Sequence, residues 1–261
     1  MTTRPDRSRP THVALALLLA LPLACGGGSD AGENSGRELF AGNADELVPH
    51  ETGRSARFRV TARQDGESRV SSFTVTVIAN DGDAFTTRYV SATGAVADGT
   101  SRDLGDEIVV VRFVNDPGGS AEEVRVLDPP AGVVRTPVVA GEAIESGFVR
   151  TLELGIRVGS GQTEQRTVVF TGSARRVPEE RGPVRVADGT YDDAIRYAVS
   201  ARGRTTIPVL GQSVAVEIDV RGDEWFAVGV GGVREDLEVG IRAGDERTTV
   251  VFTTEREGAP S

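Results

Sequence analysis

Hydrophobic and polar residues alternate along much of the chain beyond residue 50. Residues 214–220 carry Val or Ile at each even position, with Ala, Glu and Asp between them. The same alternation runs through residues 56–62 and 152–158. A period of two is typical of strands in an antiparallel sheet with one face on the core and one in water. The pattern therefore predicts an all-β domain.

Turn sequences separate the alternating segments. Asp and Gly tolerate the positive φ of tight hairpin turns, so we expect a turn at each of six Asp-Gly or Gly-Asp dipeptides that lie between these segments. Looser loops are expected at Pro117–Gly119 and at Pro129-Pro130, and one short helix near residues 38–47. The six dipeptides predicted as turns are at positions 65–66, 81–82, 98–99, 188–189, 222–223 and 244–245.

Three short sequences recur in the same order, offset by 82 to 90 residues. They predict two related β-units, at about 96–171 and 186–253. Convergent hairpin sequences in a chain rich in Val, Gly and Arg are the alternative explanation. The matching pairs are Val96–Thr100 with Val186–Thr190, Leu152–Arg157 with Leu237–Arg242, and Thr167–Thr171 with Thr249–Thr253.

Gly155 and Gly240 hold the same place in the repeated hairpins. Glycine inside a strand usually marks a bulge or a bend. We therefore expect an antiparallel, strongly curved, half-barrel-like sheet. Its concave face would either bind something or fold over its own core.

The N-terminus reads as an export signal. Three arginines precede an apolar run from Val13 to Leu23, and the single cysteine, Cys25, follows Ala24. This order resembles the lipobox of bacterial lipoproteins, in which the cysteine becomes the lipidated first residue. Pro22 departs from that pattern, and a plain secretory signal with a free thiol is the alternative. The run is too short to span a bilayer.

The resemblance implies a domain organisation. Residues 1–24 form a signal peptide and residues 25–37 a flexible Gly- and Ser-rich tether. A β-domain follows at 38–255, and residues 256–261 form a disordered tail. The expected location is the bacterial cell envelope, with the membrane as a partner through lipid at Cys25. Gly26 after the cysteine favours the outer membrane, facing the periplasm.

Charge excludes some classes of partner. The chain has a net charge of −10, and the predicted signal carries about +2 of its own. An acidic mature protein is a poor ligand for nucleic acid or anionic lipid headgroups. The sequence contains arginine but no lysine, so lysine-based catalysis is excluded.

Candidate catalytic and metal-binding residues are few. Beyond the predicted signal His50 is the only histidine, which argues against a Ser-His-Asp triad and against zinc. Asp98 and Asp188 each precede Gly-Thr, whereas aspartic proteases have Asp-Thr/Ser-Gly, so hairpin turns explain both better. Asn80–Asp83 lacks the ligand spacing of a calcium loop. No cofactor, metal or catalytic residue is predicted.

The second half of the chain resembles a known family. Residues 186–196, followed by Glu224–Arg234, look like the TapB-type β-domain of bacterial envelope proteins, which carries a W-Y-A-P-G-V-G-x-V strand. Val48-Pro49, Gly53 and Phe58 resemble its opening. Val228 replaces the usual proline, and Ala56 stands where an aromatic residue is common. The resemblance implies an architecture and no activity; its sheet is similar to those of periplasmic lipoprotein carriers.

These observations predict a non-enzymatic, lipid-anchored envelope protein that binds an apolar ligand or a protein partner. The candidate ligand face consists of Trp225, Val214, Val216 and Ile218. A single tryptophan is more often a core residue than the wall of a pocket, so a core position is the alternative for Trp225. A scaffold subunit without a ligand is the first alternative, and a carboxylate-dependent hydrolase is the second. A carrier should have a solvent-connected apolar cavity, a scaffold a filled core, and a hydrolase two converging carboxylates with shifted pKa values.

Overall fold

The structure is a computed structural model that describes residues 36–120, 122–158, 162–209, 212–244 and 246–258. Cys25, the predicted signal and most of the predicted tether lie outside these residues. The elements in chain order are β1 (Glu38–Phe40), α1 (Ala44–Leu47), β2 (Ser55–Gln64), β3 (Glu67–Asn80), β4 (Ala84–Ser91), β5 (Val96–Asp103), β6 (Glu107–Asn115), β7 (Glu123–Arg135), β8 (Val138–Val139), β9 (Ile144–Val158), β10 (Gln162–Val186), β11 (Gly189–Val209), β12 (Gln212–Ala227), β13 (Gly231–Ala243) and β14 (Glu246–Gly258).

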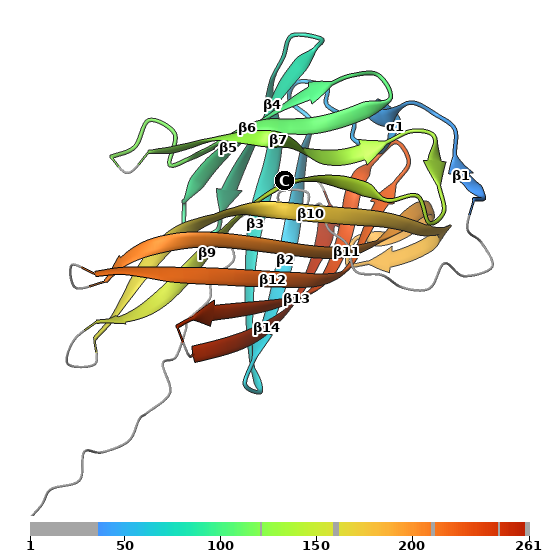
Figure 1. Ribbon diagram of the computed structural model, residues 1–261. Helices are drawn as coiled ribbons and strands as arrows, with labels where there is room; N and C mark the ends of the chain where they lie inside the picture. Colours follow the sequence, from blue (N-terminus) through green and yellow to red (C-terminus); the bar gives the residue numbers. More distant parts are fainter. Residues whose placement is uncertain (1–35, 121, 159–161, 210–211, 245, 259–261) are drawn as a thin grey trace, which may run out of the picture.

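Twelve strands form one antiparallel sheet that curls until it nearly closes (Figure 1). The strand order is β7-β6-β5-β4-β3-β2-β14-β13-β12-β11-β10-β9, so the first long strand pairs with the last. The two edge strands, β7 and β9, contact each other across a seam. At this seam a Cβ on Gly147 would lie 2.1 Å from the Pro129 carbonyl oxygen. The predicted all-β, antiparallel and strongly curved fold is confirmed.

Strand periodicity places the core on the inner face of the sheet. On β12 the even positions Val216, Ile218 and Val220 are buried, and on β13 the odd positions Leu237, Val239 and Ile241 are buried. The intervening charged residues lie on the outer face. One main cluster of buried side chains fills the interior, as the alternating pattern requires.

Two of the predicted turns are wrong, because their residues lie inside strands. Asp98-Gly99 belongs to β5, where the Asp98 carboxylate accepts two hydrogen bonds, of 2.9 and 2.8 Å, from Arg88 on β4. Gly222-Asp223 belongs to β12. There Gly222 has a φ of +149°, and a Cβ would lie 2.0 Å from the Asp236 carbonyl oxygen. Glycine at 222 thus permits close strand approach.

The predicted loop at Pro129-Pro130 is also wrong, since both prolines belong to β7. Strand β7 is an edge of the sheet. Proline is tolerated in an edge strand because the N–H that it lacks is not needed for pairing on the open side. The register with β6 also shifts here: Val126 pairs with Arg112, and the next pairing joins Ala131 to Val110.

The sequence repeat is only partly structural. Its second and third matches form the hairpins β9–β10 and β13–β14, but Leu152 pairs with Val168 whereas its counterpart Leu237 pairs with Phe252. The first match places Val96–Thr100 in a strand and its counterpart at a hairpin turn. Both proposed units belong to one continuous sheet. Strand β14 also extends to Gly258, beyond the predicted domain end at 255.

Residues 38–54 pack over one end of the curved sheet. The expected helix near 38–47 appears as β1 followed by the single turn α1, whose Ala44 and Leu47 are fully buried in the main core. Strand β1 pairs with β8 in a small second sheet. The Gly229 amide donates a 2.6 Å hydrogen bond to the Glu46 carbonyl, which attaches this segment to the β12–β13 loop.

Candidate functional site: an interior cavity with two carboxylates

A cavity of about 180 Å³ lies inside the curved sheet. Most of its wall is apolar and aromatic. Half-buried residues at its boundary, including Val48, Pro49 and Phe58, connect it with solvent next to the segment that caps the sheet. The lining residues are Val48, Pro49, Phe58, Phe73, Val75, Val77, Phe85, Thr87, Tyr89, Ser101, Val110, Val133, Glu224, Phe226, Arg234, Glu235 and Thr254.

Two carboxylates belong to this wall. Glu224 on β12 and Glu235 on β13 are directly paired residues, and both line the cavity. Glu235 is in turn the ladder partner of Thr254 on β14. Each carboxylate occupies an inward position of a strand whose other inward residues are largely apolar, so the alternation itself aims it at the interior.

Arg176 on β10 holds Glu224 in place. Its side chain is fully buried, and Nε and Nη2 lie 3.0 and 2.7 Å from Glu224 Oε2. Its Nη1 donates to the carbonyl oxygens of Gly132 and Val133 on β7. Arg176 therefore links β10 and β12 to the opposite side of the seam. Its guanidinium also lies 5.5 Å from the Phe226 ring centre.

Burial changes the protonation of the cluster. Desolvation raises the pKa of Glu235 from 4.5 to about 7, although the nearby Arg150 opposes the shift. Glu224 adds to it because two like charges disfavour ionisation. Burial also raises the pKa of Tyr89, which keeps its hydroxyl protonated. Glu235 therefore changes charge near neutral pH.

Two acceptor atoms of the wall have unused hydrogen-bonding capacity. Glu235 Oε2 and Thr254 Oγ1 are buried, and their only hydrogen-bonding contact within the part of the chain that the structure describes is the one between the two side chains, which lowers the pKa of Glu235 and opposes the effect of burial. The Thr254 side chain is 2% exposed. Because buried polar atoms are normally satisfied, these two atoms identify a place for a hydrogen-bonding ligand or solvent.

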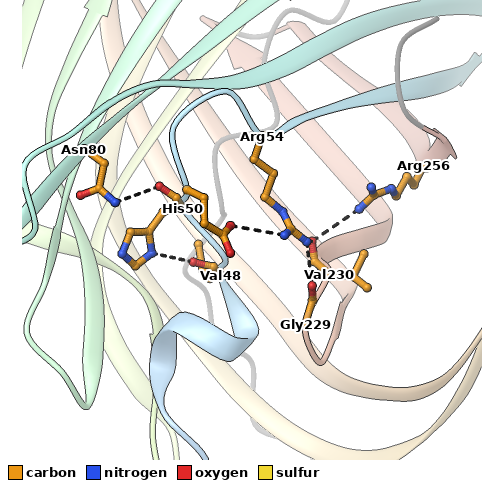
Figure 2. Close-up of polar contacts among 8 residues, drawn as sticks. Val48, His50, Arg54, Asn80, Gly229, Val230 and Arg256 are labelled. Atoms are coloured by element: carbon orange, nitrogen blue, oxygen red, sulfur yellow. Dashed lines mark hydrogen bonds and ion pairs between the residues drawn. The ribbon is translucent and has the colours of Figure 1, made fainter.

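His50 lies next to two residues that line the cavity, Pro49 and Phe85. Its ring stacks on Phe85 with centroids 4.3 Å apart, and Nε2 is 3.5 Å from Asp103. Its Nδ1 is 2.9 Å from the Val48 carbonyl oxygen (Figure 2). Asn80 donates to the His50 carbonyl at 3.1 Å. His50 therefore has a carboxylate neighbour, Asp103, that sequence reasoning missed. Its other contacts, with the Val48 carbonyl and the Phe85 ring, are structural and do not include a hydroxyl nucleophile.

Arg54 attaches the same segment to the β12–β13 loop. Its Nη2 donates a 2.7 Å hydrogen bond to the Gly229 carbonyl, and Arg256 donates to the neighbouring Val230 carbonyl at 3.4 Å (Figure 2). Gly229 and Val230 belong to the segment predicted to carry the family motif. In the structure they form a turn that receives contacts from the cap.

The predicted ligand-face residues are not brought together at this cavity. Val216 and Ile218 are buried in the main core, and Val214 packs against it half-buried. Trp225 lies on the opposite face of β12, in a second cluster with Val184, Val186, Ala194, Ala227 and Val233. None of the four predicted residues lines the cavity. An odd position on a strand cannot share a face with even ones unless a bulge intervenes.

The outer face of β10–β13 has two shallow depressions of about 650 and 560 Å³. Their walls are charged, and most of the charges are paired across strands. Arg202 lies 3.2 Å from Asp219, and Arg221 and Arg242 pair with Glu238 and Glu217. These depressions have the character of a solvated sheet surface.

Within the ranges that the structure describes, no group of three or more His, Cys, Asp or Glu residues is arranged to hold a metal ion. None of the described helices has the length and apolar character needed to cross a membrane. Large apolar side chains that are exposed include Val70, Leu104 and Val126, which belong to different parts of the sheet and its loops.

Comparison with known proteins gives similarity to two solved structures. A predicted exported protein with a YmcC-like fold from Bacteroides fragilis is 12% identical, with a TM-score of 0.35 over 86% of this chain and 100% of that one. A predicted lipoprotein from Parabacteroides distasonis is 11% identical, with a TM-score of 0.34 over 85% of this chain and 98% of that one. No protein-family model and no curated protein matches the chain.

Proposed function

We propose that this chain is a lipid-anchored protein of the bacterial cell envelope that binds a small, mainly apolar ligand inside its curved sheet, without catalysing a reaction. One observation carries the binding proposal: the 180 Å³ cavity, which has aromatic walls and a few polar groups. Ligand sites in proteins commonly have this composition. The envelope location rests on the export signal and on Cys25.

Cavity size limits the ligand. An apolar cavity of about 150 Å³ in another protein accommodates a benzene molecule. A cavity of 180 Å³ therefore accommodates a ring with one or two further heavy atoms. The acyl chains of a phospholipid do not fit without a large rearrangement of the core. The ligand is thus a small molecule rather than a membrane lipid.

Native mass spectrometry tests the proposal. The mature protein is released from bacterial envelopes in mild detergent and its mass is compared before and after denaturation. Val110→Phe fills the cavity from β6, where Val110 is 2% exposed. Val251→Phe is the matched control, because Val251 is 43% exposed on β14. We expect a small bound mass in wild type and in the control and its loss in Val110→Phe.

Two results would contradict cavity binding. One is equal retention of the small mass by Val110→Phe, provided that this variant is folded. The other is an unliganded mass in all three proteins even after incubation with benzene-sized probes. The second result would favour the scaffold alternative, and cross-linking in whole cells would then identify partners.

A carboxylate-dependent hydrolase is the second candidate, favoured by the convergence of Glu224 and Glu235 in one cavity. Such enzymes pair two carboxylates with different pKa values. Here Arg176 donates a hydrogen bond to Glu224 Oε2, so that this oxygen already has a partner. The cavity also has room only for a small substrate. Hydrolysis of small aryl esters and glycosides that is lost in Glu235→Gln would support this candidate over the binding protein.

A further inference from the structure

The polar part of the cavity wall offers acceptors to a ligand. Glu224, Glu235 and Thr254 project from three successive strands, β12, β13 and β14, and are cross-strand neighbours. Apart from the side-chain contact between Glu235 and Thr254 themselves, Oε2 of Glu235 and Oγ1 of Thr254 have no hydrogen-bond partner within the described residues, and both atoms are buried. We propose that the cavity ligand is a small amine whose ammonium group is bound by Glu235, with Thr254 as an additional acceptor. This inference rests on the proposed ligand-binding function.

The nearby arginines are placed behind this wall. Arg176 is directed at Glu224 and at the β7 carbonyls, and Arg150 is fully buried on β9. Neither residue lines the cavity. Arg234 does line it, but its guanidinium lies 5.4 Å from the Trp225 ring and pairs with Asp236 on the outer face. The charged side-chain groups presented to a ligand are therefore the two carboxylates.

The apolar part of the wall suits the rest of such a ligand. Phe58 and Phe73 stack with centroids 5.2 Å apart, and Phe85 and Phe226 complete the aromatic lining. Aromatic faces carry partial negative charge, which attracts cations and repels anions. An anionic ligand would meet both this surface and the carboxylates. An arylalkyl ammonium ion matches the wall in charge, size and polarity.

Protonation of Glu235 gives the proposal a distinctive pH dependence. Burial favours the protonated form of Glu235, and protonation competes with ammonium binding. The ionised carboxylate is the form that binds the ammonium group. The charged or titratable groups near it are Glu224 on β12, Arg234 on β13, Arg176 on β10, Arg150 on β9 and Tyr89 on β4. Amine affinity should therefore rise as pH increases through about 7, with release of a proton on binding. A ligand that accepts a hydrogen bond from the neutral acid would show the opposite dependence.

Titration calorimetry with matched probes tests this inference. The mature chain in lipid nanodiscs is titrated with benzylamine, benzyl alcohol and benzoate at pH 6 and pH 8, with empty nanodiscs subtracted. At pH 8 we expect benzylamine to bind at least about tenfold more tightly than benzyl alcohol, because a charged hydrogen bond replaces a neutral one. Benzoate should bind most weakly. Lowering the pH to 6 should weaken benzylamine binding by up to about tenfold.

Variants separate the carboxylate from general effects. Glu235→Gln should remove both the preference for benzylamine and its pH dependence. Thr254→Val should weaken benzylamine binding less and retain the pH dependence. Glu238→Gln is the matched control on β13, since Glu238 pairs with Arg221 on the outer face, and should leave all three probes unchanged.

The outcomes distinguish the two proposals. If benzyl alcohol binds as tightly as benzylamine, or benzoate binds more tightly, the ammonium inference is wrong and cavity binding stands. If Glu235→Gln retains the full amine preference, Glu235 is not the recognition group and the inference is again overturned. If none of the probes binds to wild type in a way that Val110→Phe abolishes, the proposed cavity binding fails as well.

Discussion

Glu224 and Glu235 are paired directly across β12 and β13, and both face the interior cavity. The adjacent pair, Asp223 and Asp236, repeats the like-charge arrangement one position along the ladder. Directly opposed like charges destabilise a sheet. Arg176 lies 2.7 Å from Glu224, and Arg196 lies 3.5 Å from Asp223. The sheet thus maintains an unfavourable carboxylate pairing by means of arginines supplied from neighbouring strands.

Loss of Arg176 should destabilise the protein strongly. Arg176→Met leaves Glu224 buried with no guanidinium beside it and removes the bonds to the β7 carbonyls. We expect a loss of about 3–5 kcal/mol in the free energy of unfolding. Chemical denaturation followed by circular dichroism measures it.

The control for this change is Arg202→Met, since Arg202 and Asp219 form an exposed pair. Its effect should stay below about 0.5 kcal/mol. The double variant Arg176→Met/Glu224→Met should recover part of the loss, because it removes the isolated charge. Equal effects of Arg176→Met and Arg202→Met would contradict the role given to Arg176.

Stability should depend on pH through Glu235. Its folded-state pKa of about 7 lies above the ordinary 4.5, so the folded protein holds a proton that the unfolded chain has released between these values. The contribution of Glu235 to stability therefore rises as pH falls through this window. The pKa difference corresponds to about 3 kcal/mol.

Glu235→Gln lacks this titration. The variant should exceed wild type in unfolding free energy at pH 8, by up to about 3 kcal/mol, and the advantage should disappear near pH 4.5. Glu238→Gln on the outer face is the control. If the difference in unfolding free energy between wild type and Glu235→Gln stays constant from pH 4.5 to pH 8, the prediction is wrong.

Gly222 should be intolerant of a side chain. Its φ is +149°, and an added Cβ would lie 2.0 Å from the Asp236 carbonyl oxygen. Gly222→Ala should destabilise by at least about 2 kcal/mol, since the backbone of β13 must move. Gly182→Ala is the control, because no atom lies within 4 Å of the Cβ position there. Thermal unfolding of both variants compares them; similar melting temperatures would argue against the close approach.

Trp225 should contribute to stability but not to ligand binding. Its ring is half-buried in the second cluster, and Arg234 lies 5.4 Å from the ring centre. Trp225→Ala should therefore lower the unfolding free energy by about 1–3 kcal/mol, less than a fully buried aromatic residue. Circular dichroism is the appropriate probe, because this is the only tryptophan. Probe binding in the cavity should be unchanged in Trp225→Ala. Loss of binding in this variant would indicate that the ring faces the cavity.

Membrane association should depend on Cys25. In a lipoprotein the acyl chains on this cysteine provide the anchor, so Cys25→Ser should move the protein from the membrane to the soluble fraction of an envelope preparation. Immunoblots of the two fractions measure the change. A variant that still fractionates with membranes would show that lipidation at Cys25 is not the anchor.

Charged residues at inward positions of two strands are a sequence signal for the candidate site that the sequence analysis did not use. On β13 the inward series Glu235, Leu237, Val239, Ile241 contains one polar residue, and β12 likewise carries Glu224 before the inward Phe226. A charged residue in the apolar register is buried if the strand continues. The predicted face instead combined Trp225 with even-numbered residues, which lie on the opposite side of the same strand.

The sequence by itself determined the strand periodicity and the antiparallel all-β class, because these follow from local alternation and turn chemistry. The expectation of a curved sheet came from the two glycines inside strands, Gly155 and Gly240. The sequence did not identify Asp98 and Gly222 as strand residues, since the Arg88 partner and the close β13 backbone come from other strands. Only the tertiary structure paired β2 with β14 and brought β7 to β9. These long-range contacts enclose the cavity, and such pairings depend on the packing of the whole sheet rather than on any single segment.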